Sequence, residues 1–197
     1  MALDFSKDYV LEDTVVRLEP LSEFHIDPLK DIAKERNLWT YFLGRSDGSK
    51  NFDNYVMDAL DFRAKKVEYP IAVFDKRTKK YAGCTRFFDY AGDLNTIRLG
   101  YTWYGKDFRG TGLNRHCKYL LFEFAFEGLK VERIGLGAHA ENKISLAAMR
   151  SVGCIVEGKA RNLFPAIDGE GRADAVMFSV LRQEWLKSVK NQLKEKL

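Results

Sequence analysis

Residues 109–114 read Arg-Gly-Thr-Gly-Leu-Asn and lie where a strand pattern changes into a helix pattern. Upstream, residues 97–103 (IRLGYTW) are rich in β-branched and aromatic side chains, as strands are. Downstream, apolar residues recur with the spacing of one helix face, at Leu120, Leu121, Phe124 and Ala125. The glycines let the backbone turn tightly and approach a ligand, and the first helix amides lack internal partners at the positive end of the helix dipole. The segment therefore indicates either an anion site, suited to a pyrophosphate, or an ordinary tight turn.

Composition limits the classes of protein that the chain can belong to. Its 197 residues suit one domain, residues 1–197, and 46% hydrophobic residues are ample for a core. A net charge of +4, spread along the chain, argues against a nucleic-acid binder. With no secretory signal and no apolar run of membrane-spanning length, we expect a soluble, cytoplasmic protein that does not bind membranes.

The cysteines predict no metal site. Cys84, Cys117 and Cys154 are odd in number, widely spaced and embedded in apolar stretches. None has the spacing of a metal ligand set, so reduced thiols in the core are expected.

The order of patterns along the chain predicts a mixed α+β fold. The predicted sheet is mostly antiparallel and is flanked by helices, with a central meander, one parallel βαβ crossover and a closing hairpin. A polar loop is expected at residues 44–50. The predicted strands are residues 14–18, 69–74, 81–90, 96–104, 133–139, 154–163 and 173–181, and the predicted helices are residues 22–33, 52–65, 113–127, 142–152 and 184–196.

Several motifs in this order resemble the GNAT superfamily of acetyl-CoA-dependent N-acyltransferases. Residues 109–114 are similar to its Gln/Arg-x-x-Gly-x-Gly/Ala motif, with Asn114 at the last position. Asn142-x-x-Ser145, followed by Gly153, resembles the branch that contains the ribosomal-protein N-terminal acetyltransferases. Residues 100–108, and the hairpin residues Glu157, Gly158, Arg161, Asp168, Gly169 and Asp174, resemble the same branch. The likeness spans about residues 12–186.

This resemblance implies transfer of an acetyl group from acetyl-CoA to a primary amine, on a protein N-terminus or a small molecule, by direct attack. It also implies that loop amides hold the pyrophosphate and that strand backbone pairs with the pantetheine. Dimers are common in the branch, which leaves a homodimer open. The implied CoA-binding residues are Trp103, Tyr104, Arg109, Gly110, Thr111, Gly112, Leu113, Asn114 and Asn142; for Asn142, a helix cap is the alternative.

The catalytic residues are less clear from the sequence. Ser145 is a candidate to protonate the departing thiolate, or is a packing serine. His139 is a candidate base, although a structural histidine at a strand end is favoured. Many family members carry Glu at the position of Arg98 and Tyr at the position of Met149. These departures leave open an acyl-CoA-binding protein with little or no catalysis.

The acceptor pocket is expected to include the first helical region and the closing hairpin. Trp39, Tyr41 and Phe42 are candidates for its wall, and at least one of them is expected in the core. Arg86, in Gly-Cys-Thr-Arg-Phe, matches a recurrent motif of the branch or is structural. The sequence does not identify the amine acceptor.

Overall fold

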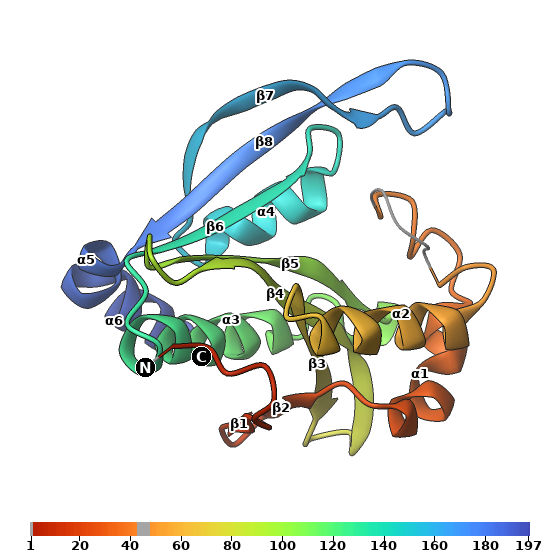
Figure 1. The fold of residues 1–197 in the computed structure, drawn as a ribbon, viewed down its shortest axis with the longest axis horizontal. Helices are drawn as coiled ribbons and strands as arrows, with labels where there is room; N and C mark the ends of the chain where they lie inside the picture. Colours follow the sequence, from red (N-terminus) through yellow and green to blue (C-terminus); the bar gives the residue numbers. More distant parts are fainter. Residues whose placement is uncertain (1, 43–47) are drawn as a thin grey trace.

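One sheet of eight strands runs through the part of the chain that the structure describes, and helices cover both of its faces (Figure 1). The structure, a computed structural model, describes residues 2–42 and 48–197. The predicted polar loop at 44–50 therefore falls largely outside the described residues.

The strand order confirms the predicted topology. Among the described strands, only the pair β5–β6 is parallel, and the other neighbouring pairs are antiparallel. The fold is thus mixed α+β, as predicted. Across the sheet the order is β1 (Leu11–Glu12), β2 (Val16–Pro20), β3 (Glu68–Asp75), β4 (Lys80–Ala91), β5 (Thr96–Tyr104), β6 (Arg133–His139), β8 (Arg172–Leu181) and β7 (Ile155–Pro165).

The helices pack in two groups. The first group, η1, α1 and α2, lies between β2 and β3 in the chain. The second group consists of the helical elements that follow β5, β6 and β8. Figure 1 shows the long β7–β8 hairpin extending past α4 at one end of the sheet. In chain order the helical elements are η1 (Glu23–His25), α1 (Ile26–Ala33), α2 (Phe52–Ala64), η2 (Lys106–Phe108), α3 (Leu113–Glu123), the π-helical turn η3 (Phe124–Gly128), α4 (Lys143–Ser151), α5 (Arg182–Glu184), the π-helical turn η4 (Trp185–Val189) and α6 (Lys190–Lys194).

Side chains alternate between two cores on opposite faces of the sheet. Ile97 and Leu99 of β5 join the larger core, which also contains residues of α3, α4 and β6. Trp103 joins the smaller core, with Tyr55 and other residues of α1 and α2. We call these the α3 face and the α2 face.

Strands β5 and β6 separate soon after they meet. Their register covers only the three pairs Thr96–Arg133, Ile97–Ile134 and Arg98–Gly135. Further along β5 the register with β4 shifts, and Tyr101 has a φ of 49°. Such a β-bulge bends a strand. Beyond these three pairs, the backbone of β5 has no ladder with β6 along its remaining residues.

Most element boundaries agree with the predictions, and β5 and β6 match them in full. The first predicted strand starts later, because the Asp13 carboxylate accepts hydrogen bonds from the amides of Val15 and Val16, both at 2.8 Å. That strand also continues through Pro20, which terminates it. Strand β1 was not predicted, since two residues are too few to show a pattern.

The cysteines behave as predicted. Cys84, Cys117 and Cys154 are free and buried. Within residues 2–42 and 48–197, no group of histidine, cysteine and carboxylate side chains has the arrangement of a metal site. Helices in the same ranges are all too short or too polar to span a bilayer.

Strand β4 contains a glycine where β5 comes very close. A Cβ built on Gly83 would lie 1.9 Å from the Trp103 carbonyl oxygen. Gly83→Ala should therefore separate β4 from β5 and lower the free energy of unfolding by about 3 kcal/mol. Gly92→Ala is the control, because its Cβ would meet only the Tyr90 side chain, at 3.4 Å or more; a change within about 0.5 kcal/mol is expected. Equal urea midpoints for the two variants would contradict this close contact.

Helix α3 buries a lysine. Lys118 is 5% exposed, and its Nζ donates to Thr102 Oγ1 at 3.1 Å. Burial lowers the pKa of this ammonium from 10.5 to about 8. Because the unfolded chain binds the proton more tightly, the burial cost is present in full below pH 8.

Lys118→Met should remove that cost. The variant should exceed the wild type in stability by about 1–3 kcal/mol at pH 7, and the gap should close as pH rises from about 8 to 10.5. Urea unfolding across this pH range measures it. The control is Lys190→Met, since Lys190 forms ion pairs with Glu123 at 2.9 Å and Glu127 at 2.7 Å and should lose stability instead. A Lys118→Met variant that is less stable at pH 7 would refute the prediction.

Candidate functional site

The loop between β5 and α3 has the conformation that its glycines permit. Gly110 and Gly112 have φ of 74° and 86°, in the left-handed region, and Gly112 is the N-cap of α3. A Cβ at either position would meet no atom within 4 Å, so both face open space. The concave side of the loop and the start of α3 can therefore admit an anionic ligand against the backbone.

Side chains of the loop hold it in place. Thr111 Oγ1 donates to the Phe108 carbonyl at 2.8 Å. Arg109 Nε donates to the Tyr104 carbonyl at 2.8 Å, which fixes its exposed guanidinium beside the loop. The Tyr104 hydroxyl in turn donates to Asn114 Oδ1 at 3.3 Å. Leu113, the first residue of α3, is fully buried and anchors the helix start in the core.

A second arginine, which the sequence analysis missed, also reaches this loop. Arg77 lies in the turn between β3 and β4, and its Nη1 donates to the Thr111 carbonyl at 3.1 Å. It is held by the buried carboxylate of Asp75, whose Oδ2 lies 2.9 Å from Nη2. The only sequence signal was a basic turn, and nothing in the sequence connects it with residues 109–114.

The end of β5 pairs with β4 and has no ladder with β6. Trp103 pairs with Cys84 and Tyr104 with Gly83, both on the β4 side. Their side chains are buried, and Trp103 Nε1 donates to the Tyr55 hydroxyl at 3.0 Å. These side chains are therefore not available to a ligand in the gap. The Trp103 carbonyl faces Gly83 of β4, and the Tyr104 carbonyl accepts a hydrogen bond from Arg109 Nε.

Helix α4 borders the same gap after β6. Asn142 is its N-cap, and Asn142 Oδ1 accepts from the Ser145 amide at 3.0 Å. Asn142 thus caps α4 through its side-chain oxygen, and its side-chain NH₂ group remains able to contact a ligand. Ser145 is half-buried, and Met149 is buried in the larger core.

His139 ends β6 in a buried position. Its Nδ1 accepts from the Glu141 amide at 3.2 Å, which places the proton of the neutral ring on Nε2. Nε2 is buried and has no hydrogen-bond partner among the described residues. The ring lies between Tyr41 and Phe164, with centroid separations of 5.5 and 6.2 Å. In this arrangement the Nε2–H group of His139 is available to donate a hydrogen bond.

The three aromatic candidates differ in burial. Trp39 belongs to the smaller core and donates from Nε1 to the Ala33 carbonyl at 2.8 Å, so one of the three is a core residue, as expected. Tyr41 is half-buried and donates to the Glu141 carbonyl at 3.2 Å. Phe42 is also half-buried and packs 5.7 Å from Tyr101 at the β5 bulge. Tyr41 and Phe42 therefore connect the segment after α1 with β6 and β5.

Arg86 is buried rather than exposed to a pocket. It is 3% exposed and forms an ion pair with Glu68 at 2.6 Å. Its guanidinium stacks over Tyr55 and Tyr101, at 4.7 and 5.2 Å from the ring centroids. Sequence analysis missed Glu68 as its partner, since the two residues meet only through β3–β4 pairing. Arg86 thus supports the bulge from the α2 face.

Arg98 lies across β6 on the α2 face. A Cβ on Gly135 would be 3.3 Å from Arg98 Cγ, and one on Gly137 would be 3.5 Å from Nη2, so two glycines make room for this side chain. Arg98 Nη1 lies 3.4 Å from Asp89 Oδ2. A cavity of about 320 Å³ lies beside Arg98 and is lined by Asp89, Thr96, Ile97, Arg98, Arg133, Gly135, Met177 and Phe178.

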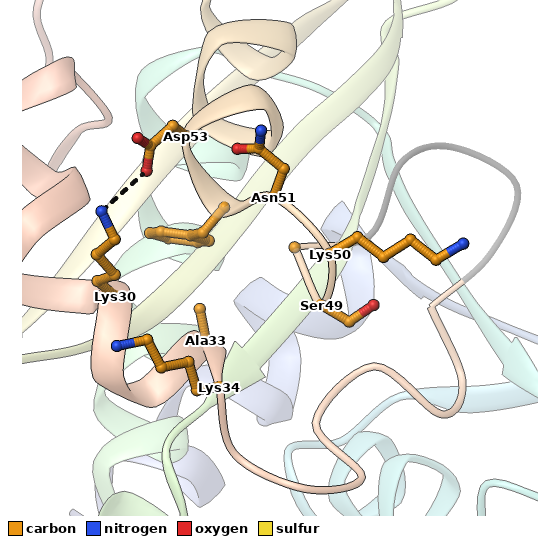
Figure 2. Close-up of a pocket in the computed structure, with 9 residues that line it drawn as sticks. Lys30, Ala33, Lys34, Ser49, Lys50, Asn51 and Asp53 are labelled. Atoms are coloured by element: carbon orange, nitrogen blue, oxygen red, sulfur yellow. Dashed lines mark ion pairs between the residues drawn. The ribbon is translucent and has the colours of Figure 1, made fainter.

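A second cavity, of about 220 Å³, lies between α1 and the segment that leads into α2 (Figure 2). Figure 2 shows Lys30 paired with Asp53, at 3.6 Å, on one side of it. Its lining includes no residue of the β5–α3 loop, β6 or α4. It is therefore separate from the predicted CoA-binding residues, although Trp39 packs against Gly48 and Ala33 of its lining.

Comparison with known proteins agrees with this geometry. Residues 16–155 match the family model described as an acetyltransferase (GNAT) domain. A Bacillus subtilis protein named Putative ribosomal N-acetyltransferase YdaF is 35% identical over 88 residues. That match covers 44% of this chain and 46% of the relative, so the chain matches about half of the relative's length.

Solved structures share the fold over nearly the whole chain. A GCN5-related N-acetyltransferase from Brucella melitensis has a TM-score of 0.85 and 24% identity, covering 96% of this chain and 85% of the other. Mycobacterium smegmatis RimJ, in complex with CoA-disulfide, has a TM-score of 0.78 and 17% identity, covering 95% and 93%. At these identities the likeness concerns the fold. The family match, the strand–glycine–helix loop and the separated parallel strands lead to one conclusion: this chain belongs to the GNAT acetyltransferase family.

Proposed function

We propose that this protein transfers the acetyl group of acetyl-CoA to a primary amine by direct attack of the amine on the thioester. The observation that carries the proposal is the open loop at Gly110 and Gly112. This loop follows the end of β5, where β5 has separated from β6. Acetyl-CoA supplies the activated acetyl group, and the chain's own residues bind it, orient it and exclude water.

On the donor side, the amides of residues 110–114 and the start of α3 would hold the pyrophosphate. Arg109 and Arg77 add positive charge beside them. The backbone of Trp103 and Tyr104 would pair with the pantetheine amides, and the Asn142 side chain would add a contact from α4. A backbone amide near the β5 bulge would stabilise the developing oxyanion.

The acceptor amine would enter from the α2 face, where Arg98, Tyr41 and His139 lie. In the observed arrangement His139 Nε2 carries a proton and would donate it in a hydrogen bond to an oxygen atom of the substrate. A nitrogen that already carries a proton cannot accept the amine proton, which argues against the base role. Arg98 cannot accept a proton. The carboxylate of Asp89, whose Oδ2 lies 3.4 Å from Arg98 Nη1, would instead take the amine proton through water.

The likeness to a ribosomal N-acetyltransferase makes peptides with a free N-terminus the first acceptors to test. A second candidate function is acyl-CoA binding with little catalysis. Arg98 and Met149, at positions where many relatives carry Glu and Tyr, favour it. A panel of N-terminal peptides and small amines, with released thiol as the readout, separates the two functions: a binder would protect against heating and release no thiol.

Gly112→Glu should abolish acetyl-CoA binding, because the added carboxylate would occupy and repel the anion site. In thermal melting, acetyl-CoA at 100 times its dissociation constant should stabilise the wild type by about 2.7 kcal/mol. The variant should show no ligand-dependent shift.

Gly169→Glu is a matched control. Gly169 has a φ of 84°, and its Cβ would also meet no atom within 4 Å, so the backbone strain and the added charge are alike. It lies in the turn between β7 and β8, and its ligand shift should equal that of the wild type. If the wild type itself shows no shift with acetyl-CoA, the proposed function is wrong.

A further inference from the structure

Lys118 is a buried cation for which the fold supplies no counter-ion. It lies in the run 116–122 of α3, in which every residue is buried. Among the described residues, no carboxylate forms an ion pair with it, and its Nζ contacts only the Thr102 hydroxyl. A leucine here would avoid the cost of burying a charge. A buried charged group without an ion partner is a candidate for function.

The contact of Lys118 places it at the β5 bulge. Thr102 directly follows Tyr101, whose φ of 49° marks the bulge. Thr102 Oγ1 lies 2.7 Å from Thr85 Oγ1 of β4, so two hydroxyls orient the ammonium from the α3 face. At this point β5 has already separated from β6.

Helix α4 approaches Lys118 from the other side. The charge of Lys118 acts on the Cys154 thiol, just after α4. The Cys154 amide donates to the Met149 carbonyl at 3.1 Å, which ties Cys154 to the last turn of α4. Lys118 is therefore near the β5 bulge and also near Cys154, which is tied to the last turn of α4, where Met149 stands at the position of a tyrosine in many family members.

We propose that the Lys118 ammonium protonates the departing sulfur of CoA. This proposal rests on the proposed function. The amine nitrogen forms a bond to the acetyl carbon, the carbon–sulfur bond breaks, and the sulfur takes a proton from Lys118 Nζ. The proton lost by the amine nitrogen passes through water to the Asp89 carboxylate, and neutral Lys118 regains a proton from solvent after product release. Lys118 thus takes the role for which Ser145 was the candidate from the sequence.

The acidity of Lys118 suits this step. Burial lowers its pKa to about 8, close to the value of about 8.5 for an ordinary alkyl thiol. The titratable groups that act on it are Cys117, the preceding residue of α3, and Cys154. Burial raises the pKa of both thiols to about 12, so neither competes as an anion near neutral pH. A serine hydroxyl is a far weaker acid than this ammonium.

The first test is a binding experiment that needs no turnover. CoA labelled at the carbon bonded to sulfur is titrated with pH by carbon NMR while bound to each variant. With the wild type, the thiol should ionise at least about one pH unit lower than with Lys118→Met. Lys190→Met should behave as the wild type. Desulfo-CoA, which lacks the sulfur, should bind the wild type and Lys118→Met equally.

The outcomes separate the two proposals. If the wild type does not bind CoA, both are overturned. If CoA binds and its thiol ionises alike in the wild type and Lys118→Met, only the assignment of Lys118 is overturned.

The second test compares rates. Lys118→Met should lower kcat about 100-fold at pH 7, with little change in KM for acetyl-CoA, and should abolish the decline of kcat above pH 8. Thr102→Val, which removes the orienting hydroxyl, should lower kcat by a smaller factor and keep that decline. A loss confined to Ser145→Ala would overturn the assignment. Melting temperatures at pH 7 establish that each variant is folded.

Discussion

The early separation of β5 from β6 is the constraint on which the rest of the structure depends. Three residue pairs hold the two halves of the sheet together, and beyond them β5 bends away at Tyr101. The bend needs support from both faces: Arg86 stacks on Tyr101 from one side, and Lys118 reaches Thr102 from the other. The gap between β5 and β6 follows directly from this arrangement.

The two faces of the gap differ in chemistry. On the α3 face lie the glycine loop, the Asn142 cap and Lys118, which are groups that suit a pyrophosphate and a leaving thiolate. On the α2 face lie Arg98, Tyr41 and His139, which suit an acceptor. Because a sheet alternates its side chains between faces, neighbouring residues of one strand serve opposite sides of the same reaction.

Buried charge has different roles on the two faces. Arg86 forms a buried ion pair with Glu68 through Nη1, and its pKa is raised, since the attraction of nearby Tyr55 and Glu68 outweighs the effect of burial. It is therefore a permanent cation that stabilises the bulge. Lys118 has only a hydroxyl partner, so burial lowers its pKa into the range where proton transfer is feasible. The same strand is thus held by one ion that cannot titrate and one that can.

The sequence by itself determined the order of elements, the glycine loop and the cap at Asn142, because these depend on residues close together in the chain. Strands β5 and β6 were predicted in full for the same reason. Only the tertiary structure decided what lies next to the site: Arg77 beside Thr111, Glu68 under Arg86, and Lys118 under the bulge. Each of these contacts joins segments that meet only when the sheet forms, and local spacing carries no information about such neighbours.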